Sequence, residues 1–424
     1  MRIAINAQIV PGLGTGGVES FVMKLVYGLG QLDDGPEEYI IIGDWQAPDW
    51  LTPYLGSNQR IVCRPKTMES SLAQRLGPLL PVAAKGRRLA RQFLGVTQAA
   101  SSSQAPVSDG FYESLGCDVI HFPYQAFAIC ALPSVYNPHD LQHLHYPQFF
   151  TPSQIAWREV IYPAGCHFTN TIAVGSEWVK QDIIDHYRVN PDKVQVIPGS
   201  PLMQTDTEPS HADVALKYQL QLPFALYPAV TWEHKNHIRL IEAIASLRTQ
   251  GIRLNLVCTG YQNDFYERIR ERLVALNLQE QVRFLGLVPR EDLQALYRLA
   301  RFVVVPSLFE AASGPIFEAW QEGAPVTCST VTSLPDQVGD AALLFDPLSV
   351  DSIADALTQM ALDNALLRTL RQRGQRRLLD FSLERTARAY RAVYRRVAGV
   401  PLSEEDEYLL SWDWMREPQR EVVA

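Results

Sequence analysis

The 424-residue chain lacks several features that would place it at once in a familiar class. No apolar run approaches the roughly 18 to 20 residues that a membrane-spanning helix needs. The six cysteines are widely spaced with no CxxC pair, which favours reduced, mostly buried thiols over disulfides or a zinc site. The formal net charge of -8 gives no support to a nucleic-acid partner. No repeat of solenoid period is present either.

The first residues, MRIAINAQIV, indicate a strand that runs directly into a glycine-rich loop. A secretory signal would instead need a basic start, a longer apolar stretch and a small-residue cleavage site. We therefore expect a cytoplasmic protein. The hydrophobic fraction of 47% and charged fraction of 20% are typical of a soluble globular protein. The length suits two domains of roughly 200 residues each.

Strand and helix patterns alternate through the first half of the chain. A strand at 3–5 and a glycine loop at 12–17 precede a helix with apolar positions on one face, namely Phe21, Val22, Leu25, Val26 and Leu29. Ser176 can cap a helix that starts at Glu177. The further expected strands are 39–42, 119–122, 134–137, 171–174 and 194–197. Strand, glycine turn and helix are typical of a βαβ unit, so we predict a parallel sheet covered by helices.

The second half alternates in the same way, after a polar linker at 199–212. The expected strands are 224–227, 254–258, 282–285, 302–306, 325–329 and 342–345. The expected helices are 237–250, 264–276, 290–300, 314–322, 350–378 and 383–397. We predict an α/β fold with two Rossmann-like, doubly wound parallel-sheet domains that face each other across a cleft. Their predicted bounds are 1–200 and 201–382, and 383–424 forms a C-terminal helix and tail that packs back towards the first domain.

The segment from 306 to 318 carries the most chemical information. An apolar strand runs into a small-residue loop that opens a helix, so free N–H groups and the positive helix end suit a phosphate or another anion. Glu310 and Glu318 lie eight residues apart around this loop. Either they bind sugar or ribose hydroxyls through charge-assisted hydrogen bonds, or Glu310 caps the helix and Glu318 is solvated. Spacing alone leaves both interpretations open.

This Glu-x7-Glu segment resembles the donor signature of glycosyltransferase family 4, whose members have the GT-B fold and retain anomeric configuration. Independent blocks extend the resemblance over about residues 1–390: 16–19, 137–141, 227–237 with Glu242 and Ala243, 333–336, 339–342 and 345–347. The resemblance implies a metal-independent retaining glycosyltransferase that moves a hexose from a nucleotide diphosphate sugar to a glycan, glycolipid or polysaccharide precursor. A UDP-sugar is favoured, with a GDP-sugar next.

The resemblance also implies roles for individual residues. Glu318 would hold the ribose hydroxyls, Glu310 would lie near the transferred sugar, and Lys235 would neutralise the diphosphate. The backbone of the loop between the two glutamates would bind the sugar or the distal phosphate, through Ala312, Ser313, Gly314 and Pro315.

Further roles concern the first half and the nucleobase. Gly16 and Gly17 would let their loop approach the phosphates without a side-chain clash. His139 would lie beside the anomeric carbon. Backbone groups near Leu287 and Val288 would recognise the base. No dedicated nucleophile is expected, because the leaving phosphate would help to deprotonate the acceptor.

The sequence departs from the family pattern at two positions in the donor half. The family often carries an arginine shortly before its lysine, whereas residues 230–233 here contain none. Lys235 then carries most of the diphosphate charge, or Arg239 supplies part of it. Ser313 stands where the family usually has glycine, which adds a hydroxyl donor and bulk near the sugar.

We expect no metal or other cofactor. No Asp-x-Asp follows a strand, and that motif is how other glycosyltransferases hold a cation. His139, His143 and His145 lie close in sequence, but Pro138 and Pro147 bracket them and no helix pattern runs through.

A basic segment covers residues 64–91 and has a net charge of +6, from seven basic residues and Glu69. It could bring the enzyme to anionic lipid at the inner face of the membrane, or it could be a solvated outer helix. Two other functions remain open for the whole chain. One is a catalytically inactive GT-B-like partner subunit, and the other is a nucleotide-sugar epimerase.

Overall fold

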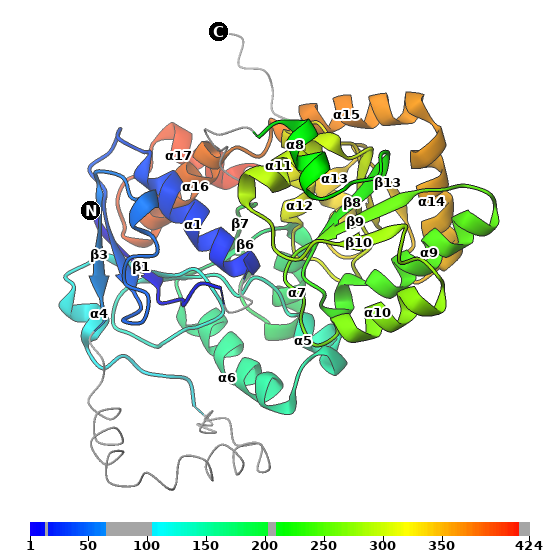
Figure 1. Ribbon diagram of the computed structural model, residues 1–424. Coiled ribbons are helices and arrows are strands. Elements are labelled where there is room, and N and C mark those ends of the chain that lie inside the picture. Colours follow the sequence, from blue (N-terminus) through cyan, green and yellow to red (C-terminus); the bar gives the residue numbers. More distant parts are fainter. Residues whose placement is uncertain (13–15, 65–103, 202–208, 415–424) are drawn as a thin grey trace, which may run out of the picture. The chain divides into compact units, whose positions relative to one another are not determined.

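The computed structural model describes residues 1–12, 16–64, 104–201 and 209–414, and they contain two parallel sheets with flanking helices (Figure 1). The strands are β1 (Arg2–Ala7), β2 (Glu38–Gly43), β3 (Gln59–Cys63), β4 (Val119–Phe122), β5 (Ser134–Tyr136), β6 (Thr171–Val174), β7 (Val194–Val196), β8 (Phe224–Pro228), β9 (Asn255–Thr259), β10 (Val282–Phe284), β11 (Phe302–Val305), β12 (Val326–Ser329) and β13 (Ala342–Phe345). The helices are α1 (Gly16–Gly30), α4 (Phe111–Ser114), α5 (Gln142–His145), α6 (Pro152–Phe168), α7 (Glu177–Tyr187), α8 (His211–Lys217), α9 (His237–Thr249), α10 (Tyr266–Ala275), α11 (Arg290–Leu299), α12 (Gly314–Gln321), α13 (Leu334–Val338), α14 (Val350–Leu362), α15 (Asn364–Leu378), α16 (Leu383–Val397) and α17 (Glu404–Ser411). Short 3-10 turns are η1 (Thr52–Tyr54), η3 (Pro147–Phe149), η4 (Pro191–Lys193) and η5 (Glu233–Lys235).

The first sheet has seven strands in the order β3-β2-β1-β4-β5-β6-β7. Its central strands are buried runs such as Ile40, Ile41 and Ile42, which are at most 1% exposed, as expected where helices cover both faces of a sheet. The chain reverses its direction of winding between β1 and β4. In open α/β sheets, ligands bind beyond the carboxyl ends of the strands at such a switch point.

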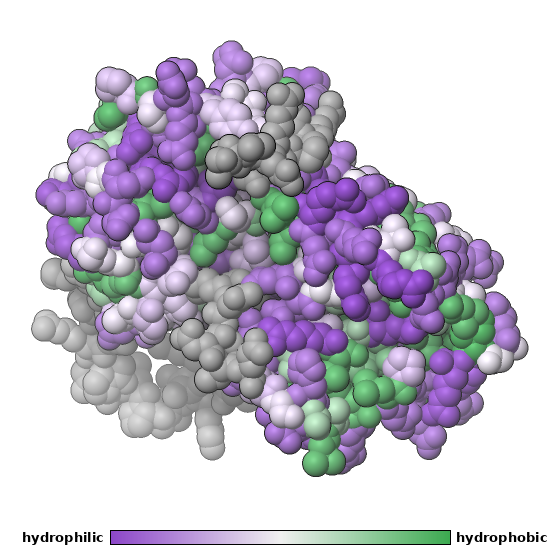
Figure 2. Space-filling view, turned by 90° about the horizontal axis from the view of Figure 1, so that it is seen from above, coloured by the Kyte–Doolittle hydropathy of each residue, from purple (hydrophilic) through white to green (hydrophobic). Residues whose placement is uncertain are grey.

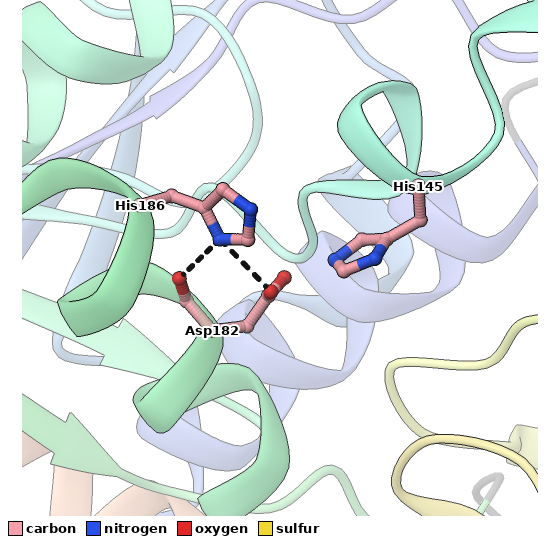
Figure 3. Close-up of side chains that lie close together, drawn as sticks. All are labelled: His145, Asp182 and His186. Carbon is pink, nitrogen blue, oxygen red and sulfur yellow. Dashed lines mark hydrogen bonds and ion pairs between the residues drawn. The ribbon is translucent and has the colours of Figure 1, made fainter.

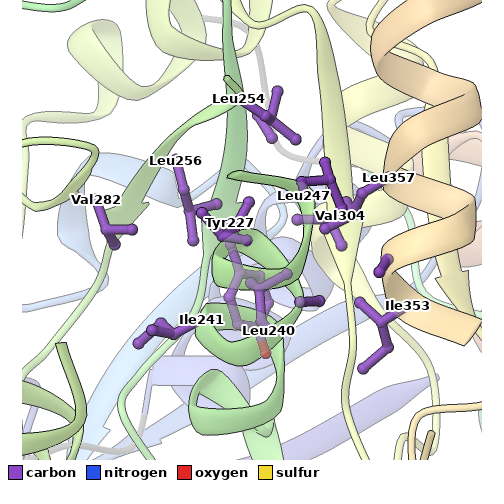
Figure 4. Close-up of a cluster of buried hydrophobic side chains, with 14 of the residues drawn as sticks. Tyr227, Leu240, Ile241, Leu247, Leu254, Leu256, Val282, Val304, Ile353 and Leu357 are labelled. Carbon is purple, nitrogen blue, oxygen red and sulfur yellow. The ribbon is translucent and has the colours of Figure 1, made fainter. Parts of the chain in front are cut away.

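The second sheet has six strands in the order β10-β9-β8-β11-β12-β13, so its switch point lies between β8 and β11. One buried cluster packs α9, α10 and α14 onto the sheet (Figure 4). A second cluster packs α11, α12 and α13 onto it. Two separate cores on one sheet confirm the predicted doubly wound architecture.

Most predicted elements lie within one or two residues of the observed ones. Ser176 caps α7 as predicted, because its Oγ accepts the Val179 N–H at 3.2 Å. The single helix expected at 350–378 is two helices. They are separated at Asp363, whose carboxylate accepts the N–H groups of Ala365 and Leu366. The short strand β3 and the helix α6, which contains Pro163, were not predicted.

Contacts along the chain define two compact units. The first comprises Met1–Pro138, His143–Ile172 and Tyr394–Val400, and the second comprises His139–Gln142, Ala173–Val393 and Pro401–Ala424. Sheet membership divides the chain differently, since β6 and β7 belong to the first sheet. The predicted domain bounds at 200 and 382 therefore stay predictions, and the predicted linker at 199–212 falls largely outside the described residues.

A polar network ties the end of α16 into the first unit. The buried His121 ring lies between the Tyr394 hydroxyl, 2.8 Å from Nδ1, and the Asn137 side chain at Nε2. With Nε2 protonated, the ring donates to Asn137 and accepts from Tyr394. Arg395 Nε also donates to the buried Glu37 carboxylate at 2.9 Å. The last turn of α16 is thus joined to the first sheet.

No helix among the described residues is long and apolar enough to cross a membrane. On the face drawn in Figure 2, hydrophilic side chains dominate and hydrophobic ones occur in small groups between them. Of the predicted basic segment only Arg64 is described, paired with Asp109 at 2.8 Å. Its remainder, 65–91, lies outside the described residues. None of the six cysteines forms a disulfide, and four of them are buried, as predicted.

Candidate functional site

Lys235 and Glu310 meet at the switch point of the second sheet. Lys235 ends the turn η5 after β8, and Glu310 lies in the loop after the neighbouring strand β11. Lys235 Nζ lies 2.7 Å from Glu310 Oε1, and the Ser307 hydroxyl donates to the same oxygen at 2.6 Å. The Lys235 side chain is 22% exposed and that of Glu310 is 10% exposed. A partly accessible cation with a shielded carboxylate partner can therefore bind an anionic ligand at this edge.

Asn236 fixes the backbone beside Lys235. It has a left-handed conformation with φ of 61°, which Asn tolerates better than most residues. Its buried amide donates to the carbonyls of Pro306 and Pro347, both at 2.9 Å. The Tyr227 hydroxyl donates to the Lys235 carbonyl at 2.7 Å. Three loops at one edge of the sheet are thereby joined through one side chain.

The Glu310 backbone is held by the segment that follows β12. The Glu310 N–H donates to Thr332 Oγ1 at 3.1 Å, and the same hydroxyl donates to the Glu310 carbonyl. The Ser333 hydroxyl donates to that carbonyl at 2.7 Å. The segment at 333–336, noted above only as part of a family pattern, thus has a positioning role.

Gln337 holds the loop between the two glutamates. Its side chain accepts the Ser313 N–H at 2.8 Å and donates to the Ser313 carbonyl at 2.9 Å, while Gln337 itself is fully buried. Pro315 has no N–H. Of the four predicted loop residues, Ala312 and Gly314 keep an N–H that has no acceptor within the described part of the chain. The Ser313 hydroxyl is buried and also lacks a partner among described residues.

Glu318 faces this loop from the first turns of α12. A side-chain carbon built on Gly314 would lie 3.7 Å from Glu318 Oε1, so the carboxylate lies over the glycine backbone. The buried Tyr297 hydroxyl donates to Glu318 Oε2 at 2.7 Å. Burial, with the nearby Glu318 charge, raises the pKa of Tyr297 well above its usual value. Tyr297 is therefore a permanent donor that orients Glu318, whose Oε1 has no hydrogen-bond donor among the described residues.

Two histidines flank Lys235 in sequence and stay neutral. Burial lowers the pKa of His234 to about 2 and that of His237 to about 3, and the Lys235 charge adds to both shifts. His237 is 1% exposed and lies against the rings of Tyr227 and Phe284. The positive charge of this segment thus comes from Lys235 and Arg239 and not from the histidines. Arg239 donates to the Asn236 side chain at 3.1 Å and supports the same loop.

Leu287 projects from the loop after β10 and is 75% exposed. The preceding loops lie close together, because the Gly260 N–H donates to the Gly286 carbonyl at 2.8 Å. Gly260 has φ of 123°, and a side-chain carbon there would lie 2.5 Å from the Ala229 carbonyl oxygen. Only glycine fits this contact without a shift of the backbone.

The predicted residues of the first sheet lie at the carboxyl ends of β1 and β5. Helix α1 begins at Gly16, so Gly16 and Gly17 form its first turn rather than the preceding loop. Gly17 has open space where a side chain would lie. Gly12, with φ of 82°, donates its N–H to Glu19 at 3.1 Å. The acidic side chain of the glycine motif thus joins Gly12 to α1.

His139 is partly buried and has a left-handed backbone with φ of 66°. Such a conformation in a residue other than glycine is frequent at functional sites. His143 lies elsewhere, buried against the Tyr162 ring with a centroid distance of 5.1 Å. The expectation that no helix runs through these histidines was wrong in part, since one turn, α5, forms at Gln142–His145. The expected absence of a metal stays a prediction.

Helix α7 carries a separate pair of titratable groups, Asp182 and His186 (Figure 3). His186 Nδ1 lies 3.1 Å from the Asp182 carboxylate and 2.9 Å from the Asp182 carbonyl. The imidazole N–H therefore satisfies a carbonyl near the end of the helix, where a positive group is also favourable. This pair stabilises α7.

Sequence reasoning missed Ser307, Tyr297 and Gln337. Each of them contacts a predicted site residue. Tyr297 and Gln337 lie on other elements than the residues they contact, whereas Ser307 lies three positions before Glu310. Gln337 lies 24 residues after Ser313, and Tyr297 lies 21 residues before Glu318. The resemblance brought residues 333–336 to attention, which is the one signal that pointed near Gln337.

Comparison with known proteins gives the family. "Glycosyltransferase Family 4" matches residues 15–200, and "Glycosyl transferases group 1" matches residues 215–377. The O-antigen chain mannosyltransferase B of Escherichia coli is 31% identical over 258 residues, which cover 58% of this chain and 66% of that protein. A D-inositol 3-phosphate glycosyltransferase of Corynebacterium glutamicum is 30% identical over 46% of this chain and 50% of its own length. The matched segments thus span between half and two thirds of these relatives.

Solved structures agree on the fold. Sucrose-phosphate synthase from Thermosynechococcus elongatus has a TM-score of 0.67 at 20% identity, covering 94% of this chain and 99% of that one. Anabaena HepE, solved with UDP and glucose, has a TM-score of 0.64 at 18% identity, covering 93% of this chain and 100% of that one. The chain belongs to the group 1 and family 4 glycosyltransferases, which have the GT-B fold.

Proposed function

We propose that the protein transfers a hexose from a nucleotide diphosphate sugar to a hydroxyl of a glycan, glycolipid or polysaccharide precursor, with retention and without a metal. The observation that carries this proposal is the Lys235–Glu310 pair at the switch point, with Glu318 one short loop away. A UDP-sugar is favoured, with a GDP-sugar next. The names of two relatives, an O-antigen chain mannosyltransferase and an inositol phosphate glycosyltransferase, support hexose transfer to such acceptors.

In this proposal the donor's ribose hydroxyls bind Glu318, and its diphosphate lies against Lys235 and the N–H groups of Ala312 and Gly314. The bond between the anomeric carbon and the diphosphate oxygen breaks as the acceptor oxygen forms its bond on the same face. The acceptor proton passes to the departing phosphate, and the nucleoside diphosphate leaves. Lys235 stabilises the negative charge that develops on the leaving group.

The remaining predicted residues belong to the same proposal. Glu310 positions Lys235 and lies near the sugar, and His139 contacts the sugar beside the anomeric carbon. Gly16 and Gly17 let the backbone approach the phosphates, and the loop at Leu287 binds the base. We place the reaction in the cytoplasm. Contact of residues 64–91 with anionic lipid stays a prediction, because all but Arg64 lie outside the described residues.

The test is turnover of UDP-, GDP- and ADP-hexoses by the full chain in EDTA, followed by proton NMR of the anomeric signal. We expect slow hydrolysis of one donor, with the released sugar first appearing in the configuration of the donor. Release in the opposite configuration would refute retention, and activity that requires added magnesium or manganese would refute the metal-free mechanism.

Two alternatives predict other outcomes of the same experiment. An epimerase would convert the donor into an isomer of unchanged mass. An inactive partner subunit would leave every donor unchanged. The complete set of Lys235, Glu310 and Glu318, each held by hydrogen bonds, favours an active transferase over the inactive subunit.

A further inference from the structure

Arg290, the first residue of α11, has donors that no described residue satisfies. Its Nε and Nη2 atoms are shielded from solvent, and neither has a hydrogen-bond partner among the residues that the structure describes. A guanidinium keeps its proton under all ordinary conditions and can only donate. Buried donors without acceptors are costly, which points to a ligand that supplies the acceptor.

The position of Arg290 relates it to the candidate site. Arg290 and Tyr297 are seven residues apart on α11, so they lie on the same face of that helix. Tyr297 donates to Glu318 from this face. Arg290 begins the helix that follows β10, so it lies at the carboxyl edge of the sheet. Arg290 therefore comes three residues after Leu287, directly after the loop that is proposed above to bind the base.

Two exposed apolar side chains lie at the same edge. Tyr261 is 43% exposed and Leu287 is 75% exposed. Each directly follows one of the two glycines, Gly260 and Gly286, whose backbones are hydrogen-bonded at 2.8 Å. An aromatic ring and an apolar side chain held on neighbouring loops suit a flat heterocycle, which can stack on them.

We propose that Arg290 binds a carbonyl oxygen of the donor nucleobase and thereby selects uracil or guanine over adenine. Guanine presents O6 and N7 as acceptors, and uracil presents ring carbonyl oxygens. Adenine has no carbonyl oxygen and places an amino donor at the corresponding edge, which opposes the guanidinium donors. The inference rests on the proposed function, because the base belongs to the nucleotide donor proposed above.

The experiment is isothermal titration of the full chain with UDP, GDP and ADP, repeated with Arg290→Gln and Arg290→Lys. The control is Arg253→Gln, which removes the same charge from an exposed position before β9. Thermal denaturation of each variant reports folding. We expect UDP or GDP to bind at least about tenfold more tightly than ADP. Arg290→Gln should weaken that binding by roughly 10- to 100-fold, leave ADP binding nearly unchanged, and so remove the preference.

Arg290→Lys should restore only part of the affinity, because lysine lacks the planar fork of donors. Arg253→Gln should bind as the wild type does. ADP binding as tight as that of UDP and GDP would overturn the inference. So would unchanged UDP or GDP binding in a folded Arg290→Gln variant. Failure of all three nucleotides to bind the wild type would instead overturn the proposed function, and the base assignment with it.

Discussion

The carboxyl edges of the two sheets are built by different means. At the second sheet, side chains from separate loops hold the candidate residues: Asn236 joins three loops, and Gln337 clamps the Ser313 backbone. Positive φ angles occur at Gly12 and His139 of the first sheet, as they also do at Asn236 and Gly260 of the second, so the contrast lies in these side-chain links. Side-chain hydrogen bonds between loops organise a charged site before the ligand arrives, which lowers the free-energy cost of binding. We infer that the second edge is the more rigidly specified of the two.

The largest expected effect concerns Lys235. Lys235→Ala removes the cation that stabilises the leaving diphosphate, so we expect the turnover rate to fall roughly 10²- to 10³-fold. The matched control is Lys217→Ala, which removes a lysine of α8 from its ion pair with Asp292 of α11. Steady-state kinetics with the preferred donor measures both. A folded Lys235→Ala variant with the wild-type rate would contradict the site assignment.

A second variant separates this effect from folding. Lys235→Ala leaves the shielded Glu310 carboxylate without its cation, which lowers stability as well as activity. Adding Glu310→Gln should recover thermal stability, because the uncompensated charge is removed. Activity should stay low. Recovery of both would show that Lys235 acts only through folding.

Replacing one glycine at the carboxyl edge of each sheet compares the rigidity of the two edges directly. Gly260→Ala puts a side-chain carbon 2.5 Å from the Ala229 oxygen at φ of 123°, so we expect a loss of about 2 to 4 kcal/mol of unfolding free energy. Gly12→Ala meets no atom within 4 Å and should cost about 1 to 2 kcal/mol, from the left-handed backbone alone. Urea unfolding measures both. Equal losses would remove the proposed difference in rigidity.

Glu318 should affect donor binding more than Tyr297 does. Glu318→Gln weakens the hydrogen bonds to the ribose, so we expect roughly 10- to 100-fold higher KM for the donor. Tyr297→Phe removes only the orienting bond at 2.7 Å and should raise KM by less than about tenfold. Donor kinetics at saturating acceptor checks the order. A larger effect of Tyr297→Phe would mean that the tyrosine contacts the donor itself.

Stability should also depend on pH. His237 has a pKa of about 3 when folded, because of burial, and about 6.5 when unfolded. Between these values the unfolded chain binds more protons, so stability falls as pH falls. His237 alone should account for about 2 kcal/mol between pH 7 and pH 5. His237→Phe should remove this contribution to the pH dependence of the unfolding free energy, measured by urea unfolding. His211→Gln, at an exposed position, should leave the pH dependence unchanged.

Much of the fold could be predicted from the sequence, because local patterns specify most strands and helices. The apolar run at β4 and the serine cap of α7 are local signals, and both predictions were confirmed. The break at Asp363 was missed because apolar periodicity continues through it. Strand β3 was missed because its first two residues, Gln59 and Arg60, are polar and leave an apolar run of only three residues.

The candidate site was predictable where its residues are part of one segment. Glu310 and Glu318 could be found from their spacing and from the resemblance. Tyr297, Gln337 and Arg290 could not, because their importance comes from contacts or missing contacts that only the folded chain creates. Sequence reasoning expected base recognition largely by backbone groups. The structure adds a side chain with unsatisfied donors at that edge.

The most direct test of the account is isothermal titration of the preferred nucleoside diphosphate into three proteins: the full chain, the Lys235→Ala/Glu318→Gln double variant, and the Lys217→Ala control. We predict that the wild type and the control bind with the same affinity in EDTA. The double variant, although folded, should bind at least about 100-fold more weakly. Equal binding by all three proteins would show that the nucleotide does not bind at the switch point of the second sheet, and would contradict the account.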